Sequence, residues 1–282
     1  MMAEVEQTNT KLPHTEPALD PNRGTTEPLR DPTLQLPRIL CLHGGGTNSR
    51  IFQAQCRAMR SKLEKHFRFV FADAPYFSHA GPDVEYVYAE WLPFRSWRRP
   101  GYAFGDPSPF TYADKEEIEK IDEALAAAMK RDDKAGGTGE WVGLLGFSQG
   151  ATLSASLLRR QQTWNMDVSS GLMPSAPATN FRFAVLMAGC GPLLWMRSDV
   201  VDSDRLEREK YELLHLPTLH VHGLKDERIA MHRKLAESCK ISTTEVIEWG
   251  GDHRVPIKTA DVARLVDGIV NVAKKAGVLF DK

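Results

Sequence analysis

Short runs of apolar residues recur along the chain after Pro37, and polar or amphipathic stretches separate them. Most of these runs are continuous rather than alternating, which is typical of strands buried on both faces of a parallel sheet. The expected strands cover Arg38–His43, Arg68–Asp73, Trp141–Phe147, Phe183–Ala188, Thr218–His222 and Glu245–Trp249.

Helical periodicity fills the intervals between these strands. In Asp114–Arg131 the apolar side chains fall on one face, and acidic residues precede basic ones, as suits the helix dipole. The other expected helices cover Ala151–Arg160, Arg228–Cys239 and Thr259–Ala276. Strand–helix–strand units in series predict one α/β domain, with right-handed crossovers, a mostly parallel central sheet and helices on both faces.

Two connections are longer than is usual in a compact domain. Residues 161–182 are rich in Ser, Pro, Ala and Met, and we expect them to form a mobile excursion over the sheet edge. Residues 74–112 are rich in aromatic side chains, a composition that argues against disorder. The aromatic residues of this second connection are Tyr76, Phe77, Tyr86, Tyr88, Trp91, Phe94, Trp97, Tyr102, Phe104, Phe110 and Tyr112.

The first 36 residues differ from the rest, because they combine acids, prolines and threonines with no apolar core. Residues 1–36 are therefore expected to be a disordered leader and residues 37–282 the folded domain. No stretch has the pattern of a secretory signal or a bilayer-spanning helix, so a cytoplasmic location is expected.

Composition narrows the function classes only slightly. The 282 residues are 42% hydrophobic and 26% charged, and the net charge of −1 gives no electrostatic reason to expect nucleic acid or a membrane surface as partner. The four cysteines are widely scattered, which favours reduced thiols over a zinc site or a disulfide framework.

The sequence Leu144-Leu145-Gly146-Phe147-Ser148-Gln149-Gly150 has the spacing G-x-S-x-G directly after a predicted strand and before a predicted helix. A tight strand-to-helix turn needs small residues on both sides, and it presents the serine hydroxyl at the end of the sheet. The five-residue pattern is common by chance. Ser148 is therefore a candidate nucleophile that needs a base and an acid from elsewhere in the chain.

Both partners are found just beyond later predicted strands. His253 follows the last strand, at the sheet end where active sites of open α/β folds gather, and is the candidate base. Asp226 follows the preceding strand and is the preferred acid, with Glu227 and Asp252 as alternatives. The order Ser148, Asp226, His253 is that of α/β-hydrolases.

A second oxyanion donor is expected from His43-Gly44-Gly45-Gly46-Thr47-Asn48, because glycines let backbone N–H groups approach a substrate oxygen. The two donors are assigned to the backbone of Gly45 and of Gln149. A phosphate-binding loop is the alternative, but neither G-x-G-x-x-G with a ribose-binding acid nor a Walker lysine is present. This chemistry implies no metal and no organic cofactor.

The segments ILCLHGGGTN, FADAP, GFSQGA, HVHGLKD and GGDHRVP together resemble the FSH family of fungal serine hydrolases, from about Arg38 to Ala276. The resemblance implies a compact α/β-hydrolase fold without the leading antiparallel strands. It maps the family's nucleophile, acid and base onto Ser148, Asp226 and His253. Asp252 departs from the glycine expected before the histidine. Relatives in this family include carboxylesterases and thioesterases that release polyketide acyl chains from carrier proteins.

We therefore expect a serine hydrolase that cleaves an ester or thioester through an acyl-enzyme, most specifically one that releases a polyketide-type acyl chain in secondary metabolism. A general short-chain carboxylesterase and a non-catalytic binding protein on a hydrolase scaffold are the alternatives. The substrate is expected to be a small-molecule or carrier-bound acyl group, with an acyl carrier protein as a possible partner.

The aromatic connection is expected either to form an apolar wall for the acyl group, with Trp91 and Trp97 as substrate-binding residues, or simply to fill the core. Within it, Arg95, Arg98 and Arg99 form a basic cluster, either as solvated surface or as a guide for an acidic carrier protein.

Overall fold

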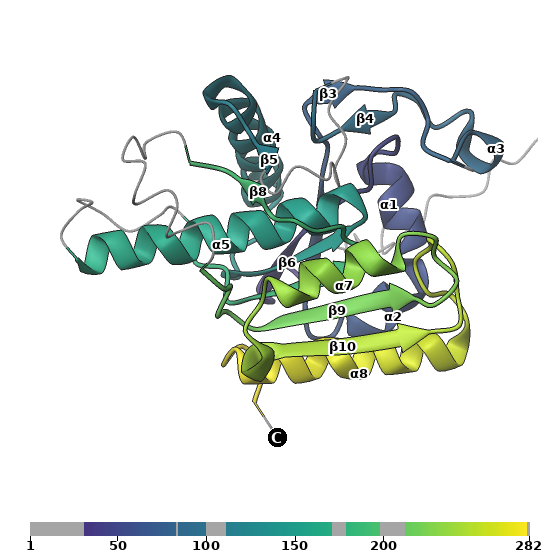
Figure 1. The fold of residues 1–282 in the computed structure, drawn as a ribbon. Helices are drawn as coiled ribbons and strands as arrows, with labels where there is room; N and C mark the ends of the chain where they lie inside the picture. The colour runs from purple at the N-terminus through teal and green to yellow at the C-terminus, as the bar shows by residue number, and fades with distance from the viewer. Residues whose placement is uncertain (1–30, 83, 100–110, 171–178, 198–211, 281–282) are drawn as a thin grey trace, which may run out of the picture. The chain divides into compact units, whose positions relative to one another are not determined.

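The computed structural model of the protein describes residues 31–82, 84–99, 111–170, 179–197 and 212–280 (Figure 1). The elements are β1 (Arg38–Leu42), α1 (Ser49–Gln55), α2 (Arg57–Leu63), β2 (Arg68–Ala72), β3 (Tyr76–Phe77), α3 (Val84–Tyr88), β4 (Arg95–Ser96), β5 (Thr111–Tyr112), α4 (Lys115–Lys134), β6 (Trp141–Phe147), α5 (Gln149–Ser169), β7 (Phe183–Met187), β8 (Leu194–Trp195), β9 (Thr218–Gly223), α7 (Ile229–Glu237), the 3₁₀ turn η1 (Ile241–Thr243), β10 (Thr244–Trp249) and α8 (Thr259–Lys275).

The six predicted strands are all confirmed, and they form one sheet in the order β10-β9-β7-β6-β1-β2. Every pairing within this sheet is parallel. Central β6 has β1 on one side and β7 on the other. The carboxyl ends of all six strands therefore meet at one edge, where open parallel sheets bind their ligands.

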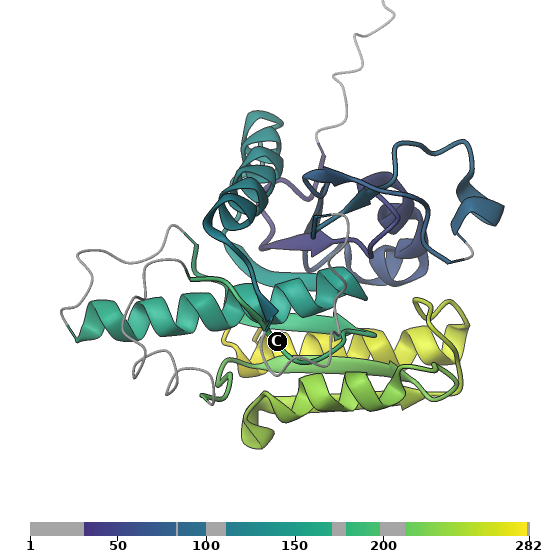
Figure 2. The ribbon, with the colours of Figure 1, turned by 45° about the horizontal axis from the view of Figure 1, so that its top comes forward.

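Helices cover both faces of the sheet, as the apolar runs predict (Figures 1 and 2). The alternation of side chains along β1 shows the two layers, because Leu40 and Leu42 pack in one buried cluster and Ile39 and Cys41 in the other. The first cluster contains residues of α4, α5 and α7, and the second contains residues of α1, α2 and α8. Both faces of a single strand are thus buried, which explains its continuous apolar sequence.

The helix after Ser148 is longer than predicted. Instead of ending at Arg160, α5 continues to Ser169, so the expectation of an excursion beginning at residue 161 is wrong for its first part. Tertiary bonds hold these polar turns: the Gln161 amide donates to Phe181 O at 2.8 Å, and Arg197 pairs with Asp167 at 2.6 Å. Residues 171–178 of that predicted excursion lie outside the described residues.

The folded unit begins at Thr33, four residues before the predicted boundary at Pro37. Leu34 O accepts from the backbone N–H of Thr138 at 2.7 Å, which ties this short segment to the turn before β6. The predicted disordered leader falls mainly on residues 1–30, which are not described, and it stays a prediction. None of the described helices combines the length and the hydropathy needed to cross a bilayer.

Candidate active site

Ser148 lies on the turn between β6 and α5, at the carboxyl edge of the sheet. Its backbone has φ 53° and ψ −118°, a left-handed conformation that costs energy for a residue with a side chain. Its N–H donates to Met187 O of the neighbouring strand at 2.8 Å, which holds the turn in place. A Cβ on Gly150 would collide with the carbonyl oxygen of Leu42, and one on Gly146 with the backbone of Ala151. Both glycines of G-x-S-x-G are therefore required sterically.

The three predicted catalytic side chains are brought together in one hydrogen-bonded chain. Ser148 Oγ lies 2.9 Å from His253 Nε2, and His253 Nδ1 lies 2.6 Å from Asp226 Oδ2. An ionised carboxylate only accepts, so Nδ1 carries the hydrogen and Nε2 of the neutral ring accepts from the serine hydroxyl. This is the tautomer that a general base needs.

The alternative acids do not take this position. Asp252 is exposed and lies 3.4 Å from Arg254, and Glu227 is exposed on the turn after β9. Asp226 is only 5% exposed, so it alone of the three presents a desolvated carboxylate to the histidine.

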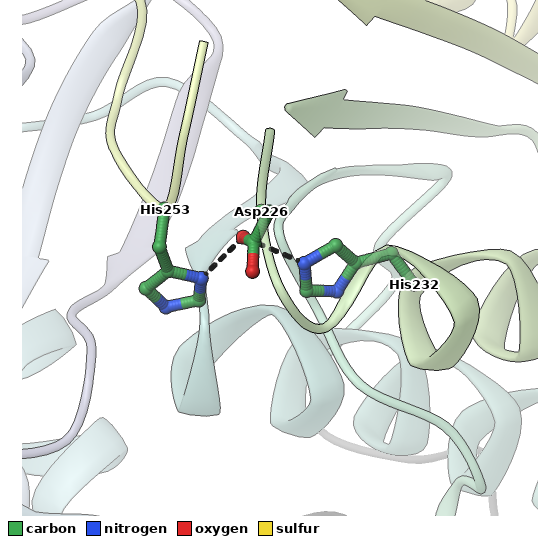
Figure 3. Close-up of side chains that lie close together, drawn as sticks. All are labelled: Asp226, His232 and His253. Carbon is green, nitrogen blue, oxygen red and sulfur yellow. Dashed lines mark hydrogen bonds and ion pairs between the residues drawn. The ribbon is translucent and has the colours of Figure 1, made fainter. Parts of the chain in front are cut away.

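Asp226 has a further partner that the sequence did not indicate. His232, the fourth residue of α7, places Nε2 2.8 Å from the same Oδ2 atom that accepts from His253 (Figure 3). The other oxygen, Oδ1, accepts from the backbone N–H of Arg228 at 2.9 Å. The only signal in the sequence is a histidine six residues after Asp226 on the buried face of a helix, where a core histidine is the ordinary interpretation.

The pKa values of Asp226 and His253 follow from these contacts. Burial alone would raise the pKa of Asp226, but the hydrogen bonds from the Arg228 amide, His232 and His253 together hold it below its ordinary value. Burial lowers the pKa of His253, the Asp226 carboxylate opposes this shift, and His232 adds to it, with a net lowering. At neutral pH the aspartate is therefore ionised and His253 is neutral.

The glycine loop after β1 lies beside the serine turn. The Cβ position of Gly44 is 3.5 Å from Ser148 Cβ, and that of Gly45 is 3.1 Å from the side chain of Gln149. Gln149 is the first residue of α5, whose N–H has no carbonyl partner within the helix. The glycine loop therefore lies against the serine turn, and the assignment of the oxyanion donors to the backbone of Gly45 and Gln149 stays a prediction.

His43 fixes the start of this loop. Its Nε2 accepts from the Ala74 N–H at 3.1 Å, so Nδ1 carries the hydrogen and donates to Gly44 O at 2.7 Å. Burial lowers the pKa of His43 to about 4, and the ring stays neutral in its fixed tautomer. His43 is a structural support for the loop and does not touch Ser148 in this arrangement.

The described part of the aromatic connection is hydrogen-bonded directly to the glycine loop. The backbone of Arg95 accepts from Gly46 N–H at 2.9 Å and donates to Thr47 O at 2.7 Å. The side-chain amide of Asn48, which also caps α1, donates to Trp91 O at 2.6 Å. The segment that carries β3, α3 and β4 is thus built onto the same loop that borders the serine. Residues 100–110 of the connection lie outside the described residues.

The two tryptophans predicted to bind substrate have different environments. Trp97 is fully buried, and its Nε1–H donates to His43 O at 2.8 Å. Its backbone N–H donates to Gln149 Oε1 at 2.7 Å, so Trp97 joins the glycine loop to the serine turn and offers no exposed surface to a substrate. The interpretation of Trp97 as a substrate contact is therefore corrected to a core anchor. Trp91 is half-buried under the guanidinium of Arg50, 4.1 Å from its ring.

The three arginines of the basic cluster do not form a common surface. Arg98 is buried and pairs with Glu117 at 2.7 Å, and Arg99 pairs with Asp114 and Glu116 at 2.9 Å. The Arg95 guanidinium donates to Ala74 O at 3.0 Å. The Arg98 pair is internal, which corrects the expectation of a solvated side chain there, whereas Arg99 forms its pairs at the surface. A carrier-guiding role for the cluster stays a prediction.

Asp226, His232 and His253 are also the group of described residues whose ligand atoms could share a metal ion, since these atoms lie within 4.8 Å of one another. Each of the three atoms is already engaged in the hydrogen bonds of Figure 3. The four cysteines are free and buried, so none of them offers an exposed thiol.

Comparison with known proteins decides the family. Residues 33–265 match the family described as serine hydrolase (FSH1). The chain belongs to the FSH1 serine hydrolases. Among curated proteins, a probable esterase of Aspergillus terreus is 50% identical to this chain, and the match covers 92% of this chain and 97% of that protein. Esterase claE of Penicillium crustosum is 47% identical, and the match covers 90% of this chain and 99% of that protein.

Among solved structures, SOBER1 of Arabidopsis thaliana is similar at 18% identity, with a TM-score of 0.48 over 84% of this chain and 98% of that one. The FSH1 assignment rests on the family match and the curated relatives. It agrees with the resemblance read from the motifs, and it makes this protein a serine hydrolase, whose parallel sheet with helices on both faces is the α/β architecture that the resemblance implies.

Proposed function

We propose that this FSH1 hydrolase cleaves an ester or thioester with Ser148 as nucleophile, His253 as general base and Asp226 as the acid that orients it. The observation that carries the proposal is the unbroken chain of short hydrogen bonds, 2.9 Å from Ser148 Oγ to His253 Nε2 and 2.6 Å from His253 Nδ1 to Asp226 Oδ2. Relatives named as esterases support the reaction class.

The reaction proceeds in two steps. His253 Nε2 takes the proton of Ser148 as Oγ attacks the acyl carbonyl, and the N–H groups of Gly45 and Gln149 stabilise the oxyanion. The histidine returns its proton to the departing alcohol or thiol, which leaves an acyl-serine. Water, deprotonated by the same nitrogen, then releases the acid and restores the serine.

For the substrate, the proposal is a polyketide-type acyl chain released in secondary metabolism. The segment bonded to the glycine loop exposes large apolar side chains, with Phe77 and Leu92 each 66% exposed and Tyr86 94% exposed. Apolar surface on a segment that is bonded to the glycine loop suits a long or cyclic acyl group better than a small polar one. Trp91 belongs to the same segment and keeps its proposed role as a substrate contact.

A fluorophosphonate probe tests the nucleophile. The purified protein should be labelled, Ser148→Ala should not, and Ser61→Ala, an exposed serine on α2, should be labelled like the wild type. Labelling that survives in Ser148→Ala would refute the assignment.

The form in which the acyl chain arrives needs a separate test. Hydrolysis of the same acyl group is compared as a carrier-protein thioester, as a small N-acetylcysteamine thioester and as a p-nitrophenyl ester. A higher kcat/KM for the carrier-bound form supports delivery by an acyl carrier protein. A clear preference for short-chain p-nitrophenyl esters identifies a general carboxylesterase instead.

A further inference from the structure

His232 is more buried than any residue of the proposed triad. Its side chain has no exposed surface, and it lies on α7, which packs on β9. The serine, the base and the acid are complete without it, yet its Nε2 is 2.8 Å from Oδ2 of Asp226. Asp226 Oδ2 therefore has two imidazole partners, one of which is not part of the triad.

The hydrogen on Nε2 follows from what surrounds the ring. Nε2 faces the Asp226 carboxylate, which only accepts, so Nε2 must donate. Nδ1 lies 3.0 Å from the Gly189 carbonyl oxygen and 3.7 Å from Cys190 Sγ. A ring protonated on both nitrogens satisfies both oxygens, and a ring with one hydrogen satisfies Asp226 and can accept from the Cys190 thiol. Nε2 carries a hydrogen in either form.

The two histidines therefore compete for one atom. His253 Nδ1 approaches Oδ2 at 2.6 Å and His232 Nε2 approaches it at 2.8 Å, with the ring centroids 5.9 Å apart (Figure 3). Because Oδ2 accepts a hydrogen bond from His232, it attracts the Nδ1 hydrogen of His253 less strongly. Resting on the triad proposed above, we infer that His232 is a positioning residue: its Nε2–H holds the Asp226 carboxylate in place and limits how basic Asp226 makes His253.

Several titratable groups face these two rings. The His232 ring lies against Asp226, on the loop after β9, and against His253, on the loop after β10. It also lies against the His222 ring of β9, with centroids 5.9 Å apart, and against Cys190, on the loop after β7. Arg228, at the N-terminus of α7, also lowers the pKa of His253. Burial lowers the pKa of His222 to about 4, so that ring is neutral and adds no charge near pH 7.

The direction of the effect is the same for both forms of His232. Without its hydrogen bond, Asp226 loses one of the three contacts that lower its pKa, and its carboxylate interacts more strongly with His253. When its ring is protonated on both nitrogens, His232 also lowers the pKa of His253 through its charge. Removal of His232 therefore raises the pKa of the base, and a higher pH is needed before His253 can deprotonate Ser148.

The test compares three variants at equal numbers of fluorophosphonate-reactive serines. His232→Leu removes the donor, whereas His232→Gln keeps an N–H at the position of Nε2 without a second ring. His220→Gln is the matched control, because His220 is also buried, on β9, and has no contact with Asp226 among its described partners.

We expect His232→Leu to lower kcat about ten-fold or more, the loss of a hydrogen bond to a charged group. The midpoint of the acid limb in its pH profile of kcat/KM should shift to higher pH by about half a unit or more. KM should change little, because His232 touches no substrate. His232→Gln should recover most of kcat and His220→Gln should match the wild type. An unchanged pH profile and kcat per reactive serine in His232→Leu would overturn the inference.

A measurement on the wild-type protein covers variants that do not fold. The ¹⁵N spectrum of the histidine rings at neutral pH should show His232 with a hydrogen on Nε2, and an Nε2 without hydrogen overturns the inference. If the triad proposal itself is wrong, the result is different: the wild-type protein is then not labelled by the fluorophosphonate probe.

Discussion

Replacement of Asp226 by asparagine should inactivate the enzyme by reversing a hydrogen-bond direction rather than by disturbing the fold. Asp226 Oδ1 accepts from the Arg228 N–H at 2.9 Å, so the new amide oxygen stays there, and the amide nitrogen takes the place of Oδ2. A donor now faces His253 Nδ1 and His232 Nε2. His232 can adapt by moving its hydrogen to Nδ1, where Gly189 O lies 3.0 Å away.

His253 adapts in the same way, and this adaptation is what destroys catalysis. With the hydrogen moved to Nε2, the ring presents a donor to Ser148 Oγ, 2.9 Å away, and can no longer accept its proton. All polar groups stay paired, so the wrong tautomer is the favoured state of Asp226→Asn. A wrong tautomer in a serine triad costs about 10⁴ in kcat, which is roughly 5 kcal/mol of transition-state stabilisation.

The assay is kcat on a p-nitrophenyl ester, with thermal unfolding to show that the variant is folded. Asp252→Asn and Glu227→Gln are the controls, because both side chains are exposed and neither is part of the hydrogen-bonded chain; each should stay within about two-fold of the wild type, as surface substitutions do. A folded Asp226→Asn protein that keeps a tenth or more of wild-type kcat would refute the reasoning about the tautomer.

Three further predictions follow from the same structure. Because burial lowers the pKa of His253, the acid limb of kcat/KM should have its midpoint below about pH 6.5, and a midpoint above pH 7 contradicts this account. Gly150→Ala should cost about 3 kcal/mol in unfolding free energy, measured in urea, because its Cβ meets Leu42 O, whereas Gly250→Ala, with open space around it, should change stability by less than about 0.5 kcal/mol. Arg98→Ala should destabilise the protein by about 3 kcal/mol by leaving Glu117 buried without its guanidinium, and Arg99→Ala, a more exposed pair, should have little effect; equal effects of the two would argue against the buried pair.

The sheet and the serine turn could be predicted because each depends on local sequence. Residues buried on both faces of a parallel strand must be continuously apolar, and a turn as tight as that of Ser148 must have glycines beside it. Asp226 and His253 could be placed because parallel strands bring their carboxyl ends to one edge.

What could not be predicted depends on contacts between distant segments. The last turns of α5 are polar, and their helical state relies on bonds such as Gln161 to Phe181, which no local pattern shows. Arg98 appears solvent-facing in the sequence because its partner Glu117 is on a helix after the connection. His232 could not be told from an ordinary core histidine, because its role depends on which atom its ring meets.

Ser148 and His253 are separated by 105 residues in the chain and by a single hydrogen bond in the fold. On the ribosome, the proposed nucleophile is therefore made long before the proposed base, and β10, the strand that precedes His253, is the last strand of the sheet to be translated. A nascent or truncated chain that lacks β9 and β10 has a serine without a proton acceptor. With the proposed triad, hydrolytic activity therefore requires that synthesis has passed β10.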